Sequence, residues 1–183
     1  MTALQAPFRT HSGRMVDLLN PNPEDVCLED IAHHLARVCR FGGAVDRFYS
    51  VASHSVYVAA NIVTDSRELQ RAALLHDAAE AYLGDMVSGL KRYMSAFCAA
   101  ERAWSLCIEA RFDVRFLSKP AIKDADLRAR LSEARDLFVG YPRELLLGGE
   151  GDRAPFAARC IEHTPDEAEW AFLAMADRLG VGS

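Results

Sequence analysis

Residues 72–85 read A-A-L-L-H-D-A-A-E-A-Y-L-G-D, and this stretch decides how the rest of the chain is interpreted. Its apolar residues predict a buried helix that begins after Ser66, a good N-cap, runs to about Tyr82 and ends at Gly84. The polar side chains that interrupt this helix are His76, Asp77 and Glu80. Because positions three and four apart lie on the same side of a helix, these side chains are expected to meet in one pocket.

An adjacent histidine and aspartate present a neutral nitrogen and a carboxylate oxygen. That mixture of donors suits a borderline divalent cation holding a reactive water. His54 lies in a second apolar stretch, S-V-A-S-H-S-V-Y-V-A-A, which also predicts a helix. Buried polar groups need partners, and a metal ion is one way to supply them. Taken alone, His76-Asp77 would be interpreted as a histidine held by a neighbouring carboxylate. The metal interpretation therefore depends on Glu80 and His54 as well.

The sequence I-K-D-A-D-L offers two further carboxylates, Asp124 and Asp126, on roughly opposite faces of a predicted helix. Only one of them can face inward, and periodicity leaves both open because apolar residues lie on both sides. Asp126 shares a face with Glu133, whereas Asp124 is spaced to pair with Arg128.

The chain as a whole predicts an all-α bundle with one N-terminal exception. Residues 1–29 contain a turn at Ser12-Gly13 between short extended pieces, compatible with a small β-hairpin, and form an extension to a bundle at 30–183. Residues 141–155 contain G-G-E-G and predict a loop. The helices expected from apolar periodicity and capping signals cover about 30–40, 53–63, 66–82, 87–94, 95–112, 118–139 and 164–179.

Composition narrows the function classes. The chain has 183 residues, 50% of them hydrophobic, and a formal net charge of -5. This predicts a single globular domain without the basic surface that duplex nucleic acid requires. Five cysteines without a C-x-x-C pair indicate reduced thiols in a cytoplasmic protein. We expect no signal peptide and no membrane span, because no long apolar run is present.

The order H…HD…D, with the H-D pair late in an apolar helix, resembles the HD-domain metal-dependent phosphohydrolases. The resemblance covers roughly Asp30 to Phe138. The runs C-R-F-G-G, S-V-A-S-H-S and L-L-H-D-A-A-E-A-Y-L-G-D are similar to the compact branch, which includes 5′-deoxynucleotidases and phage deoxynucleoside triphosphohydrolases of the dATPase type. The A-D-L context is similar to the family's final aspartate and favours Asp126 over Asp124.

This resemblance implies an activity and a metal site. The metal ligands would be His54, His76, Asp77 and Asp126, and the divalent ion would be Mn²⁺, Co²⁺, Zn²⁺ or Mg²⁺. Metal-bound water would attack phosphorus of a deoxynucleoside monophosphate. A dNTP triphosphohydrolase that releases triphosphate is the alternative, and a non-catalytic nucleotide-binding module is a third reading. The family also implies a homo-oligomer, dimeric or hexameric, with a small-molecule nucleotide as its substrate.

The same resemblance assigns further roles around the metal. Glu80 is the candidate for orienting or deprotonating the water, and Asp85 for holding the water or a sugar hydroxyl. Arg40 and Phe41 match a family position at which an arginine contacts phosphate and an aromatic residue follows it. Lys91 would reach the phosphate chain, although G-D-M-V-S-G-L-K departs from the Pro-containing stretch usual in relatives.

Overall fold

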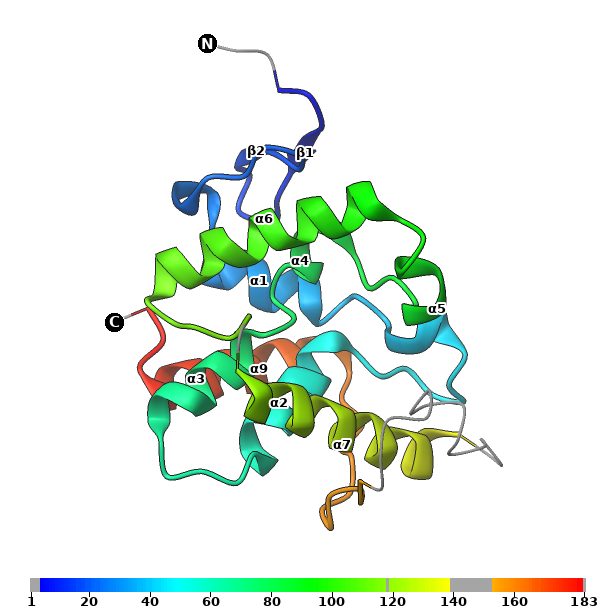
Figure 1. Ribbon diagram of the computed structural model, residues 1–183. Coiled ribbons are helices and arrows are strands. Elements are labelled where there is room, and N and C mark those ends of the chain that lie inside the picture. The colour runs from blue at the N-terminus through cyan, green and yellow to red at the C-terminus, as the bar shows by residue number, and fades with distance from the viewer. Residues whose placement is uncertain (1–3, 118, 139–152, 183) are drawn as a thin grey trace.

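The structure, a computed structural model, describes residues 4–117, 119–138 and 153–182. It is mostly helical, as expected, with one two-stranded sheet near the N-terminus (Figure 1). Most of the loop expected at 141–155 lies outside the described residues. The elements are β1 (Pro7–Arg9), β2 (Met15–Asp17), η1 (Pro23–Asp25), α1 (Leu28–Leu35), η2 (Arg40–Gly43), α2 (Val51–Asn61), α3 (Arg67–Leu75), α4 (Glu80–Leu83), α5 (Ser88–Lys91), α6 (Ser95–Phe112), α7 (Pro120–Leu137) and α9 (Pro165–Leu179).

The helix α9 packs against α1, α2 and α3, while α2 also contacts α7. In Figure 1, α6 crosses one side of the molecule and α7 crosses the other, with the remaining helices between and behind them. The core includes Trp104 of α6, which is fully buried and stacks on Tyr82 with ring centroids 3.7 Å apart. The indole nitrogen of Trp104 donates to Leu18 O at 3.1 Å, so the aromatic core is also tied to the N-terminal extension.

The predicted hairpin is present. β1 and β2 pair antiparallel, with Phe8 opposite Val16. The loop between the strands is held against α1, because Ser12 donates from its backbone and its hydroxyl to the Asp30 carboxylate at 2.6 and 2.7 Å.

The capping signals are confirmed where the sequence showed them. The Ser66 hydroxyl accepts from Leu69 N and begins α3. Thr164 and Glu167 form the reciprocal capping box at the start of α9, and Pro120 occupies the first turn of α7.

The expected helix at 30–40 is wrong at its C-terminal end, because α1 stops at Leu35. The backbone beyond it pairs with the segment that precedes α2. Arg40 N donates to Tyr49 O at 2.9 Å, and Val51 N donates to Val38 O at 3.0 Å. These hydrogen bonds replace the helical ones, and they place Arg40 at the start of η2 rather than at a helix C-terminus.

The expected helix at 66–82 is also wrong, because α3 ends at Leu75 and α4 begins at Glu80. His76 Nδ1 lies 2.8 Å from Ala73 O, the carbonyl that the amide of Asp77 would use in a continuous α-helix. The following amides instead bond three residues back, as Ala78 N does to Leu75 O. His76 and Asp77 therefore lie in a tight turn and not on a regular helix face.

Candidate metal centre

His54 reaches the site from α2 and is fully buried. Its Nδ1 lies 2.6 Å from Glu133 Oε1 of α7. A carboxylate acceptor at this distance fixes the Nδ1–H tautomer and leaves Nε2 as the donor atom. Burial and the charge of Arg40 lower the pKa of His54, but Glu133 and Asp126 outweigh them and the pKa is raised to about 9. The site thus favours a positive charge at this nitrogen, either a proton or a cation.

His76 and Asp77 enter from the turn between α3 and α4. Because His76 Nδ1 contacts Ala73 O, its Nε2 is turned toward His54, with 3.4 Å between the two Nε2 atoms. The Oδ2 atom of Asp77 lies 3.4 Å from His54 Nε2 and 3.2 Å from His76 Nε2. The break in the helix is therefore what brings adjacent side chains to one point.

Asp126 of α7 completes the arrangement, with Oδ1 3.3 Å from His54 Nε2. Its other oxygen lies 3.6 Å from Arg130 Nη2, one helical turn away. Asp124 instead pairs with Arg153 at 2.6 Å, not with Arg128 as its spacing suggested. Of the two candidate carboxylates, Asp126 is the one that faces the histidines.

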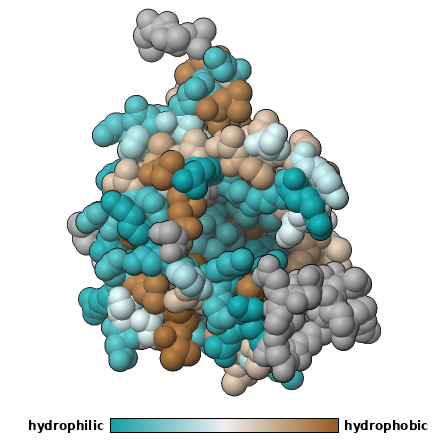
Figure 2. All heavy atoms as spheres, in the orientation of Figure 1, coloured by the Kyte–Doolittle hydropathy of each residue, from teal (hydrophilic) through white to brown (hydrophobic). Residues whose placement is uncertain are grey.

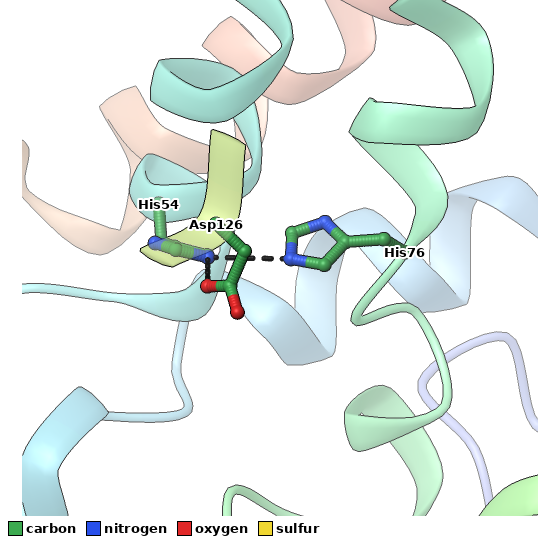
Figure 3. Close-up of side chains that lie close together, drawn as sticks. All are labelled: His54, His76 and Asp126. Atoms are coloured by element: carbon green, nitrogen blue, oxygen red, sulfur yellow. Dashed lines mark hydrogen bonds and ion pairs between the residues drawn. The ribbon is translucent and has the colours of Figure 1, made fainter. Parts of the chain in front are cut away.

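The three side chains in Figure 3 come from α2, α7 and the turn after α3, and they point toward one another. The donor atoms of His54, His76 and Asp126 all lie within 4.8 Å of one another. Two ligands of a tetrahedral ion at a bond length of roughly 2.1 Å would be about 3.4 Å apart. The separations of 3.3 and 3.4 Å around His54 match that spacing, so these residues fit a divalent cation.

The surroundings of these donors are strongly charged. Arg40 is buried, with Nη1 3.5 Å from Asp77 Oδ2 and Nη2 3.2 Å from Glu133 Oε2. Its guanidinium offsets part of the negative charge that three carboxylates concentrate here. The buried Oε2 of Glu80 and the buried Nε of Arg40 have no hydrogen-bond partner among the described residues. Buried polar atoms of this kind mark a place where a ligand or water would bind.

The surroundings of the site shift the pKa values of its carboxyl groups in opposite directions. Burial alone would raise the pKa of Asp77, yet nearby His76, His54 and a guanidinium hold it well below its usual range. Burial likewise opposes the fall at Asp126, where the contact with His54 dominates and the pKa is about 2. At Glu80 burial and the charge of Asp77 raise the pKa well above its ordinary value. The arrangement therefore offers two ionised carboxylates beside a carboxyl that can hold a proton.

The remaining predicted residues lie around this centre. Asp85 follows Gly84 at the end of α4. Burial raises its pKa, and the positive charge of Arg40 opposes part of this rise. Lys91 is ion-paired with Glu101 of α6 at 2.5 Å. Phe41 has a left-handed backbone, with φ of 56°, which is uncommon for a bulky side chain. Its ring packs edge-on against Phe138, with centroids 5.2 Å apart.

Glu133 is the residue that the sequence did not single out as part of the site. Its side chain is fully buried between His54 and Arg40. Its only sequence signal was the helical face that it shares with Asp126, seven residues earlier.

The surface view shows a hollow on one face of the molecule. In Figure 2, the face seen is hollowed between α6 and α7, and hydrophilic residues line much of the hollow.

No helix among residues 4–117, 119–138 and 153–182 is long and apolar enough to cross a membrane. All five cysteines are free, as expected.

The fold and site define a helical protein with a His/His/Asp group that could hold a metal ion. The chain is 33% identical over 130 residues to the uncharacterized protein YfdR of Escherichia coli, which is 71% of each chain. It is 34% identical over 155 residues to an uncharacterized protein of Rhodobacter capsulatus, covering 79% of this chain and 76% of that one. No family model matches the chain. The chain therefore belongs to the same family as YfdR.

Proposed function

We propose that this protein is a metal-dependent phosphohydrolase of the HD-domain class that acts on deoxynucleotides, as a 5′-deoxynucleotidase. The observation that carries the proposal is the convergence on His54 Nε2 of three further donor atoms, from His76, Asp77 and Asp126, all within 3.4 Å. A divalent cation held by these atoms would lower the pKa of water and polarise a phosphoryl oxygen.

The residues around the donors supply the other requirements of the reaction. Glu80, whose pKa burial raises, can hold or take the proton that a nucleophilic water must lose or that a leaving group must gain. Arg40 contributes a fixed positive charge next to Asp77, where it can offset negative charge on a phosphate. Asp85 and Lys91 follow α4 in the chain and remain candidates for contacts with the sugar and the phosphate.

The proposal is tested by measuring phosphate and triphosphate release from the four dNMPs and the four dNTPs, with Mn²⁺, Co²⁺, Mg²⁺ and Zn²⁺ in turn. Phosphate release from monophosphates supports the 5′-deoxynucleotidase. Triphosphate release from dNTPs would instead support the triphosphohydrolase alternative. If metal binds stoichiometrically and no nucleotide is hydrolysed, the enzyme proposal fails and a metal-holding binding module remains.

The metal ligands are tested by Asp77→Ala, for which we expect loss of turnover to background and reduced metal content in the purified protein. Asp124→Ala is the matched control, because Asp124 lies near Asp126 in sequence but pairs with Arg153. Full activity in Asp77→Ala would show that the site is wrongly placed.

A further inference from the structure

Arg130 lies on the face of α7 that carries two groups of the candidate metal centre. It follows Asp126 by four residues and precedes Glu133 by three, so the three side chains project from one face of the helix. The Asp126 carboxylate faces His54, and Glu133 is fully buried against the same histidine. Arg130 is therefore placed next to the centre by α7, although neither its residue type nor its spacing had marked it as part of the site.

The guanidinium of Arg130 is incompletely satisfied by the protein around it. Its Nη2 lies 3.6 Å from Asp126 Oδ2, which is too long for a hydrogen bond. Its Nε is buried and has no hydrogen-bond partner in the part of the chain that the structure describes. A guanidinium carries several N–H donors, and a buried donor without an acceptor is unfavourable. An acceptor supplied by a ligand would remove this cost.

This lack of an acceptor is not general to the arginines of α7. Arg128, two residues earlier, donates from Nε to Ala154 O at 3.1 Å, and its guanidinium lies over the ring of Phe156. The side chains of Arg128 and Arg130 are each partly buried. The difference between them is therefore one of surroundings, and the unsatisfied donor occurs at the arginine that lies beside a proposed metal ligand.

Arg40 shows the same pattern next to Asp77. Its Nη1 lies 3.5 Å from Asp77 Oδ2, and its buried Nε likewise has no hydrogen-bond partner among the described residues. Two guanidinium groups, from η2 and from α7, thus each approach one carboxylate of the centre and each keep a buried donor unused. Phosphate oxygens accept strong charge-assisted hydrogen bonds from arginine, whose planar fork of donors matches their geometry.

Taking the metal-dependent phosphohydrolase as given, we propose that Arg130 is a further substrate-binding residue, whose guanidinium donates to an oxygen of the nucleotide phosphate beside Asp126. The alternative role is that of an ion pair that only holds Asp126 in place. Loss of such a structural contact would weaken metal binding through Asp126. Loss of an anion contact would weaken phosphate binding instead, and removal of a positive charge from beside a cation site would leave metal binding unchanged or stronger.

The test compares the wild type, Arg130→Gln, Arg130→Lys and the control Arg128→Gln by titration calorimetry, first with Mn²⁺ and then with inorganic phosphate in the presence of Mn²⁺. In Arg130→Gln we expect the Kd for phosphate to rise about tenfold, as for loss of one charged hydrogen bond, with no weakening of Mn²⁺ binding. Arg130→Lys should recover part of the affinity, because it restores the charge but not the planar fork. Arg128→Gln should change neither value.

Weaker Mn²⁺ binding in Arg130→Gln, with or without weaker phosphate binding, would overturn the proposal in favour of the structural ion pair. Unchanged phosphate affinity, or absence of phosphate binding to the wild type, would also overturn it. Steady-state kinetics with dAMP separate this result from the fate of the proposed function. Arg130-dependent phosphate binding without turnover by the wild type would retain the anion contact and reject the hydrolase. Turnover with the same KM in the wild type and in Arg130→Gln would do the reverse.

Discussion

Glu133 shows how one residue can determine the behaviour of the whole centre. Its side chain is fully buried, and its two oxygens contact the histidine and the arginine that flank the site, His54 at 2.6 Å and Arg40 at 3.2 Å. A carboxylate that accepts from the far nitrogen of a metal-binding histidine orients the ring and raises its basicity. With a metal bound as proposed, Glu133 would therefore be a positioning residue that acts on the ion through His54.

Replacement of Glu133 by glutamine tests this role with little change in shape. The amide oxygen can still accept from His54 Nδ1, but the negative charge is lost. We therefore expect metal affinity to fall by roughly 10- to 100-fold. The measurement is a competition titration with a chromogenic chelator, with circular dichroism to verify the fold. Glu162→Gln, at an exposed carboxylate paired with Arg47, is the control. Unchanged affinity in a folded Glu133→Gln protein would contradict the positioning role.

At the level of the elements, the hairpin depends on one carboxylate. Asp17 at the end of β2 accepts from Gln5 N at 2.9 Å, Ala6 N at 3.1 Å and Leu19 N at 3.0 Å. The amide of Gln5 makes the largest contribution in lowering the pKa of Asp17 from 3.8 to about 2. A lowered pKa means that the ionised form stabilises the folded state. This contribution is complete above about pH 4 and is lost as the pH falls through about 2.

The corresponding prediction concerns Asp17→Asn. Urea unfolding at pH 6 should show a lower midpoint for the variant than for the wild type, because the anionic acceptor is gone. The gap between the two midpoints should narrow as the pH is lowered from 4 to 2, where the wild-type carboxylate becomes protonated. A gap that stays constant over this interval would show that Asp17 does not titrate with folding.

The sequence predicted the elements well where the determining interactions are local. The caps at Ser66 and Thr164 each satisfy amides within three residues, so the signal and the structure lie in the same few positions. The break after α3 was not predicted, because A-A-L-L-H-D-A-A-E is apolar and rich in good helix formers. At the break, the side chain of His76 turns back to the Ala73 carbonyl, a contact that the sequence pattern does not reveal.

The same reasoning applies to the site. His54, His76 and Asp126 could be proposed from residue types and their order, and the structure brings them together. Glu133 could not be recognised, because a glutamate on a helix is ordinarily solvated, and its burial here follows from the packing of α7 against α2. The placement of Arg40 likewise depends on backbone pairing between residues 38–40 and 49–51, a contact that helical periodicity does not reveal.

For the molecule as a whole, the candidate metal ligands join segments that are far apart in sequence. His54 lies on α2, His76 after α3 and Asp126 on α7, so one ion would hold together three parts of the bundle. The unfolded chain has no such preformed arrangement. A ligand that binds only the folded state raises the free energy of unfolding by RT ln(1 + [L]/Kd), about 2.7 kcal/mol at a concentration of 100 Kd.

We therefore expect thermal unfolding of the chelator-treated protein to shift upward with added Mn²⁺ and to saturate. For a domain of this size, roughly 2.7 kcal/mol corresponds to a rise in Tm of about 5–11 °C. Asp126→Asn should lose most of the shift, because it removes a charged donor 3.3 Å from His54. Asp124→Asn should retain it, since that carboxylate pairs with Arg153 away from the histidines. Equal shifts in the two variants would mean that the ion binds elsewhere and that the convergence of α2, α3 and α7 serves packing alone.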